Sequence, residues 1–351
     1  MPVVAALALA GVGPLATSLT ASAHGSLPPR TAAQLLVDVQ QAKLQALSGT
    51  VVETSDLGLP SLPTFGGRGG GSTSFSSLVS GSHTLRLWYA GPDRVRVALL
   101  GQLGESDLVR NGTDVWAWSS SDNTATHWSV PSDGTAPLTP DQGTGPSMTP
   151  QQAAEAALKA IDPSTRVATD PTAVVAGRSA YQLDLTPRDP RSLVGSVRIA
   201  IDGSTHIPTR VQVFARGATS PAFQIGFTSF STATPPASTF GFRPPPGATV
   251  KQGNAAQPDS GAPKHARPAN AAPQVVGTGW TSVVIAHVGT GTTGQGSSIA
   301  SALESLPTVS GSWGSGHLLR GPLFSAVLTD GGRLAVGAVA PQMLYDALAH
   351  G

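Results

Sequence analysis

One glycine pattern in the chain has a spacing that could do chemistry. Residues 289–294 read G-T-G-T-T-G, which matches the G-x-G-x-x-G pattern of a dinucleotide-binding loop. Such a loop belongs to a parallel βαβ unit with an acidic residue about 20 positions further on, which binds the ribose. Residues 309–312 occupy that place and read V-S-G-S, without an acidic side chain. We therefore interpret the glycines as a loop between a strand and a helix.

Other catalytic and metal-binding patterns are missing from the sequence. No G-x-S-x-G motif presents a nucleophilic serine, and no H-E-x-x-H motif presents a zinc-binding histidine pair. The chain has no cysteine, and its eight histidines are scattered. The net charge is +1 without a basic cluster, so we expect no nucleic-acid partner. The sequence therefore predicts a protein that is not an enzyme and that uses no metal and no cofactor.

The chemistry that the sequence does support is the binding of an apolar ligand. Between His83 and Val130, apolar and polar residues alternate with the period of a β-strand, and four of the six tryptophans occur there. Residues 180–186 and 195–201 alternate in the same way. Each buried methylene contributes about 0.8 kcal/mol, so such faces could bind an acyl chain with micromolar affinity. We predict a pocket lined by Leu85, Leu87, Val95, Val97, Leu99, Trp116, Trp118, Leu183, Leu185 and Ile199.

Two alternatives stay open for these residues. The aliphatic side chains could instead pack against helices and fill an ordinary core. If Asn111 and Gly112 form a hairpin turn, Trp116 and Trp118 lie on the face opposite to Leu108. The two tryptophans then either line the cavity, which we favour, or pack outside it under a loop or against a second domain.

The elements that position these residues form a mainly β (α+β) fold with two domains. We expect a helix at 31–47, strands at 50–54, 172–176, 208–214 and 222–230, and a helix at 149–161. Residues 31–250 form the first domain, and 251–274, which are polar and proline-bearing, form a linker. Residues 275–351 form a small α+β domain with the order β-α-β-β-α, whose helices lie at 297–306 and 341–349.

The N-terminus predicts export. An apolar run is followed by A-S-A at residues 21–23, which is typical of a signal-peptide cleavage site, so we assign 1–23 to a signal peptide. The run lacks the usual Lys or Arg before it, which leaves an uncleaved N-terminal membrane anchor as the alternative. The chain also has 41 glycines and 30 prolines. With its many alanines, this composition is typical of high-GC bacteria such as actinobacteria.

Five motifs between Pro92 and Gly247 resemble the LolA/LolB/RseB group of lipoprotein-handling proteins, to which MucB-RseB-like proteins belong. The segments are P-D-R-V-R-V at 92–97, V-R-N-G-T-D-V-W-A-W at 109–118, Y-Q-L-D-L-T-P at 181–187, the hairpin at 199–211 and F-G-F-R-P-P-P-G at 240–247. They occur in the group's order, and the resemblance covers about 31–250. The glycine-rich residues 66–71 depart from the group's pattern.

The resemblance implies an incomplete antiparallel β-barrel, plugged by helices, whose apolar cavity holds acyl chains. Its partners would be lipid acyl chains or a lipoprotein, and its location extracytoplasmic. The trailing small domain resembles the RseB architecture, which would add an anti-sigma factor or a membrane protein as a partner. The alternative is a regulatory module of the RseB type that binds protein and no lipid.

Overall fold

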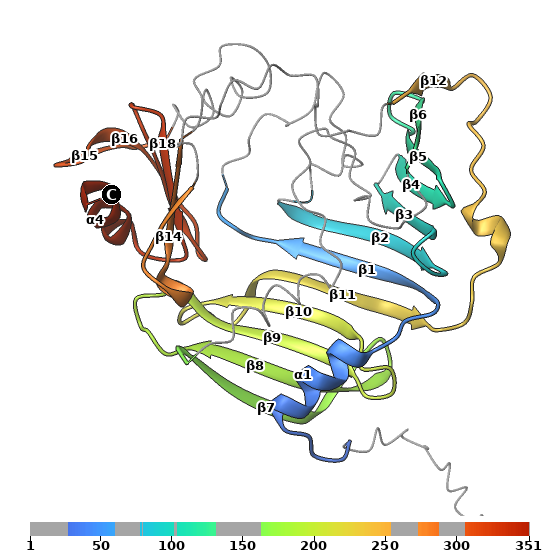
Figure 1. Cartoon of the computed structure of the whole chain (residues 1–351), viewed down its shortest axis with the longest axis horizontal. Helices are drawn as coiled ribbons and strands as arrows, with labels where there is room; N and C mark the ends of the chain where they lie inside the picture. The colour runs from blue at the N-terminus through green and yellow to red at the C-terminus, as the bar shows by residue number, and fades with distance from the viewer. Residues whose placement is uncertain are drawn as a thin grey trace, which may run out of the picture.

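The structure is a computed structural model that describes residues 27–59, 78, 80–101, 104–130, 163–253, 273–287 and 306–350. A twelve-stranded sheet has the order β12-β6-β5-β4-β3-β2-β1-β11-β10-β9-β8-β7, and its two edges do not pair with each other (Figure 1). The predicted incomplete antiparallel β-barrel is therefore confirmed. The strands are β1 (Leu47–Ser55), β2 (Gly81–Tyr89), β3 (Arg94–Leu100), β4 (Glu105–Asn111), β5 (Asp114–Ser119), β6 (Thr124–Ser129), β7 (Thr165–Val175), β8 (Arg178–Pro187), β9 (Val194–Asp202), β10 (Pro208–Ala215), β11 (Pro221–Ser231) and β12 (Thr249–Gln252).

The strands form because apolar residues alternate along them. In β8, Tyr181, Leu183 and Leu185 are buried, and the residues between them are half-buried. Every strand pair is antiparallel except β12 with β6. Strand β7 was predicted to begin at Thr172 and begins at Thr165. It forms one edge of the sheet, and its pairing with β8 is irregular between Asp170 and Ala173, where Pro171 lies. Such an irregularity and a proline at an edge strand limit pairing with further strands.

Helix α1 (Ala32–Gln41) covers one face of the sheet. A capping box starts it, because the Thr31 side chain accepts from the Gln34 backbone and the Gln34 side chain accepts from the Thr31 backbone. The helix was predicted to continue to Leu47. It ends earlier because Leu47 begins β1 and is buried there among the apolar residues of the sheet.

The C-terminal domain is a six-stranded sheet with the order β13-β14-β18-β17-β16-β15, packed on helix α4. Its elements are β13 (Gln274–Val276), η4 (Gly279–Thr281), β14 (Val283–His287), β15 (Thr308–Gly311), β16 (Gly314–Arg320), β17 (Ser325–Thr329), β18 (Arg333–Gly337) and α4 (Pro341–His350). Trp313 stacks on Tyr345 with ring centroids 5.5 Å apart. The predicted α+β class is confirmed, whereas β13 and the β15–β16 hairpin were not predicted.

Several predicted features lie outside the described residues. These are the signal peptide at 1–23, the helix at 149–161, the glycine-rich segments at 66–71 and 289–294, and most of the helix at 297–306 and of the linker at 251–274. Among the described residues, no helix is long and apolar enough to cross a membrane.

Candidate functional site

All the aliphatic residues predicted to bind a ligand lie on one face of the large sheet. The strand register pairs Leu85 with Leu99 and Leu87 with Val97 at one end of this surface. It pairs Leu183 with Ile199 at the other end. The helix α1 packs on the same face through Leu35, so we call this surface the α1 face. One continuous cluster of apolar side chains therefore runs from β3 through the sheet to β8.

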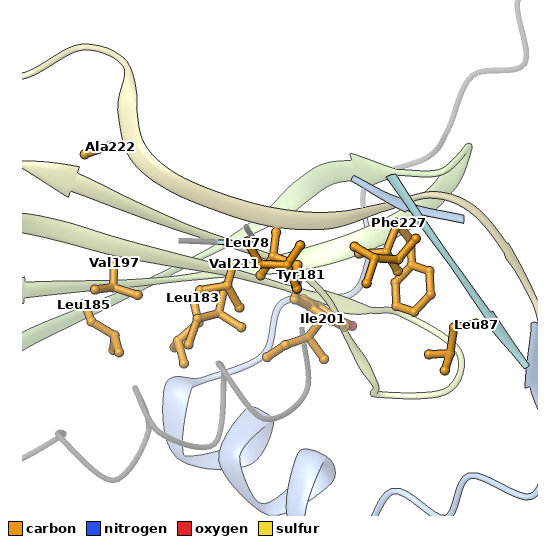
Figure 2. Packing of buried hydrophobic residues seen from close by; sticks show 14 of the residues in the cluster. Leu78, Leu87, Tyr181, Leu183, Leu185, Val197, Ile201, Val211, Ala222 and Phe227 are labelled. Atoms are coloured by element: carbon orange, nitrogen blue, oxygen red, sulfur yellow. The ribbon is translucent and has the colours of Figure 1, made fainter. Parts of the chain in front are cut away.

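The predicted residues of the α1 face differ in how far they are covered. Leu183, Leu185 and Ile199 are fully buried in the cluster that includes Leu35 of α1. Figure 2 shows Leu183 and Leu185 pointing from the sheet toward the helix. On β3, by contrast, Val95 and Val97 are only half-buried, although they border the same cluster. Among the predicted ligand-binding aliphatic residues, Val95 and Val97 are therefore the least covered, whereas Leu85, Leu87 and Leu99 beside them are buried.

The apolar residues of the α1 face extend further than the sequence indicated, to β5 and β6. Val115 pairs with Trp128 across β5 and β6, and both are buried in a small apolar cluster with half-buried Leu108. The register places all three residues on the α1 face. Sequence reasoning did not select Trp128, although the alternation of β6 places it on the face opposite to His127.

The structure corrects the expected placement of Trp116 and Trp118. The register pairs Trp116 with Val109 and Trp118 with Asp107, on the face opposite to α1. The hairpin turn lies at Gly112 and Thr113, one residue later than predicted, and Gly112 has a positive φ of 65°. This shift does not change which residues share a face. The two tryptophans are thus separated by the sheet from Leu85 and Val97, and they pack under a loop, which was the alternative.

That loop is the segment of residues 232–248, which we call the crossover segment. It leaves β11 beside β1, carries η2 (Ala237–Phe240), passes β3 and β4, and ends at β12 beside β6 (Figure 1). Phe242 lies on Trp116 and Trp118, with ring centroids 5.3 and 6.5 Å apart. The crossover segment therefore covers the part of the sheet at β3 to β6 on the crossover face, which is the side opposite to the α1 face. At β1 and β2 the same face has a pocket, lined by Thr50, Arg86 and Trp88 among others.

Polar contacts hold the crossover face together. Arg96 donates to both carboxylate oxygens of buried Asp107, at 3.0 and 3.1 Å. The same guanidinium lies 5.4 Å from the ring centre of Trp88 and donates to the Thr239 carbonyl oxygen at 3.5 Å. Arg96 thus links the sheet to the crossover segment and has no part in the α1 face.

Two buried charged residues, Arg110 and Glu53, interrupt the apolar α1 face. Arg110, on β4, lies between Val95 and Val115 and donates to the Gly112 carbonyl oxygen at 3.1 Å and to Asp93 at 3.2 Å. Glu53, on β1, is 3% exposed, and its cross-strand neighbours on this face are Ile225 and His83. Neither carboxylate oxygen has a hydrogen-bond partner among the residues that the structure describes. Burial raises the pKa of Glu53 to about 8, so the carboxyl group is mostly protonated at neutral pH. Sequence reasoning missed Glu53, since strand alternation predicts its face but not that it lacks a partner.

Metal chemistry finds no support in the described part of the chain. Within residues 27–350, leaving aside the gaps given above, no group of three or more His, Asp or Glu side chains is arranged to hold a metal ion. The α1 face offers apolar contacts, the guanidinium of Arg110 and the protonated carboxyl group of Glu53.

Comparison with known proteins gives structural similarity without close sequence relatives. No protein-family model matches the chain, and no curated protein matches it. The chain is similar in structure to MucB. The crystal structure of MucB in complex with MucA(peri) is 16% identical, with a TM-score of 0.43, over 91% of this chain and 97% of that one. The Pseudomonas aeruginosa MucA/MucB complex is 15% identical, with a TM-score of 0.42, over 90% of this chain and 95% of that one.

A LolA-superfamily protein from Nitrosomonas europaea is also similar, at 11% identity and a TM-score of 0.22. This similarity covers 61% of this chain and 99% of that one. MucB and LolA belong to the group that the five sequence motifs indicated. Because these similarities are distant, the function proposed below rests on the residues and geometry of this chain.

Proposed function

We propose that this protein is exported and binds the acyl chains of a lipid or a lipoprotein on its α1 face, as a carrier or as an envelope-stress sensor. The observation that carries the proposal is one continuous apolar surface on which Val95 and Val97 keep part of their area exposed. The half at β8 and β9 is packed under α1, whereas Val95 and Val97 on β3 remain half-buried. An acyl chain that contacts Val95 and Val97 would complete the burial of this apolar surface.

The first experiment asks whether the protein carries lipid. Native mass spectrometry of the protein purified from its own host would detect a bound lipid as a stoichiometric mass difference. A fluorescent fatty acid should also bind, with an affinity near the micromolar range that one acyl chain can supply. A clean apo mass together with no uptake of the fluorescent probe would contradict the proposal.

Substitutions on the two faces then locate the site. We expect the double substitution Val95→Asn and Val97→Asn to weaken uptake about tenfold, because it removes apolar contacts worth about 1.4 kcal/mol. Val284→Asn is the matched control, since Val284 is 40% exposed on β14 of the other sheet. Trp116→Ala should leave uptake unchanged. Loss of uptake in a folded Trp116→Ala variant would move the site to the crossover face and overturn this placement.

A second candidate function is a regulatory module that binds protein and no lipid. The observation that favours it is the complete burial of Leu183, Leu185 and Ile199, which is typical of a filled core. Its partner would be an anti-sigma factor or another membrane protein, as the sequence resemblance implies. Absence of lipid in the native mass spectrum, with the half-barrel intact, would favour this function.

A further inference from the structure

Buried polar side chains gather at one end of the α1 face. Glu53 and Ser55 on β1, His83 on β2 and Ser106 on β4 are each less than a tenth exposed. The register places Glu53 beside His83, and Ser106 beside Leu99. Next to this polar band lie Val51, Leu85 and Leu87, which belong to the apolar cluster. The apolar residues of the α1 face are therefore bordered by this polar band at one end and by buried Arg110, beside Val95, at the other. An apolar surface next to a polar band suits an amphiphile.

Within the polar band, Glu53 is the group whose contacts are incomplete. His83 directs Nε2 to the Ser80 carbonyl oxygen at 2.8 Å, so this atom already has a partner. Neither carboxylate oxygen of Glu53 has a hydrogen-bond partner among the described residues, although both are shielded from water. A buried polar group without a hydrogen bond is costly, and native structures keep one mainly where a ligand, ion or water completes it.

The surroundings of Glu53 favour a neutral ligand group over a cation. Its cross-strand neighbour on β11 is Ile225, and on β2 it is His83, the one titratable residue that the described register sets beside it. With a pKa raised to about 8 by burial, the carboxyl group holds its proton at neutral pH. A protonated carboxyl group donates one hydrogen bond and accepts others. An ammonium group bound here would lose its hydration, and the protonated carboxyl group has no negative charge to compensate for that loss.

We propose that Glu53 binds the ester carbonyl of an acylglycerol group through its protonated carboxyl, with the acyl chain lying along Leu85, Leu87 and Val97. This inference rests on the proposed acyl-binding function and specifies which end of the ligand lies at the polar band. The ester can belong to a free glycerolipid or to the diacylglyceryl group of a lipoprotein, because the bonding atoms are the same.

The test compares an ester with its ether analogue. Monopalmitoylglycerol and 1-O-hexadecylglycerol compete against the fluorescent fatty acid on the full chain, since the two probes differ in the carbonyl that Glu53 would bind. We expect the wild type to prefer the ester about fivefold at pH 7. Glu53→Gln keeps a donor and should keep the preference. Glu53→Leu should bind the ether as the wild type does and lose the preference for the ester.

A pH series separates this role from a merely structural one. The ester preference of the wild type should fall as the pH passes about 8, where Glu53 ionises. Glu53→Gln should show no such fall, because an amide does not titrate in this range. A diacylated lipopeptide measured beside monopalmitoylglycerol shows whether the ester of a lipoprotein or of a free lipid is the better ligand.

The possible failures are distinguishable. If wild type and variants all take up both probes without discrimination, or if Glu53→Leu keeps the full ester preference, the role of Glu53 is wrong and acyl binding stands. Preferential binding of hexadecylammonium over the ester would overturn the ester assignment in favour of a cationic head group. If the wild type takes up no probe, both the proposed function and the inference fail.

Discussion

Two buried carboxyl groups in the large sheet show how partners decide the state of an acidic residue. Asp202 is 1% exposed and accepts hydrogen bonds from Arg178 at 2.6 and 3.0 Å and from the Thr205 backbone at 2.8 Å. Burial raises the pKa of Asp202, but the bonds from Arg178 and Thr205 outweigh it and leave the pKa below its usual value. Glu53 has burial without such bonds, and its pKa rises. Asp202 therefore stabilises a turn, whereas Glu53 lowers stability where it ionises.

The pH dependence of stability follows from the pKa of Glu53. The pKa of Glu53 is about 8 in the folded protein and 4.5 in the unfolded chain, so the folded protein binds the proton more tightly. This proton binding contributes fully to the free energy of unfolding below pH 4.5, and the contribution is lost as the pH rises to about 8. We expect the free energy of unfolding of Glu53→Gln to equal that of the wild type near pH 4.5 and to be several kcal/mol larger near pH 8.

Urea denaturation at both pH values measures this difference. Asp122→Asn, at an exposed turn, is the control and should change stability equally little at the two pH values. Equal stability of wild type and Glu53→Gln near pH 8 would show that Glu53 is ionised and paired in the folded protein.

At the scale of elements, the crossover segment covers one part of the large sheet, at β3 to β6. Its Phe242 covers Trp116 and Trp118, and the Asn123 side chain donates to the Gly247 carbonyl oxygen at 3.0 Å. The segment then delivers β12 to the edge strand β6. With Trp116 and Trp118 covered in this way, the crossover face keeps a pocket at Thr50, Arg86 and Trp88, while the continuous apolar cluster lies on the α1 face.

Phe242→Ala tests this closure. We expect a loss of about 1–2 kcal/mol in the free energy of unfolding, because a half-buried ring leaves two tryptophans partly uncovered. Tryptophan fluorescence should become easier to quench with iodide, while uptake of the fluorescent fatty acid stays at the wild-type level. Phe223→Ala on the α1 face is the comparison, and it should affect uptake and not tryptophan quenching. Reduced uptake in Phe242→Ala would mean that the two faces are coupled.

The elements differ in how well their sequences predict them. Alternation predicted the face of each residue in β8 and β9, and it showed that Trp116 and Trp118 oppose Leu108. It could not show which of the two faces meets α1, because that depends on contacts between strands far apart in the chain. Strand β12 reads T-V-K-Q and is exposed throughout, so no alternation marks it. The β15–β16 hairpin was missed because glycines and serines dilute its apolar pattern.

On the scale of the whole molecule, the C-terminal domain is joined to the half-barrel by specific contacts. The Leu193 backbone N–H donates to the Ala338 carbonyl oxygen at 2.7 Å, and Ser192 forms a β-bridge with Val339. Trp280 donates from Nε1 to the Thr165 hydroxyl oxygen at 2.7 Å and borders the core cluster of the large sheet. These contacts join the C-terminal sheet to the half-barrel by hydrogen bonds and packing in addition to the chain that connects them.

Hydrogen exchange can measure how strongly these contacts hold the domains together. The Leu193 amide is a suitable reporter because its hydrogen bond spans the two domains, whereas the Leu183 amide lies within the large sheet. Trp280→Phe loses the bond to Thr165 and keeps an aromatic ring, so we expect Leu193 to exchange about fivefold faster. Trp280→Ala also removes the packing of the ring against the core of the large sheet, and it should accelerate exchange of the Leu193 amide more than a hundredfold.

Leu183 should exchange at the wild-type rate in both variants, because opening of the interface leaves the half-barrel folded. Trp88→Phe, on the crossover face, is the control and should leave Leu193 unchanged. If Leu183 accelerates together with Leu193 in Trp280→Ala, the C-terminal domain is part of one cooperative unit with the half-barrel. Ligand binding on the α1 face would then be felt in both domains, because stabilising the half-barrel would stabilise the interface as well.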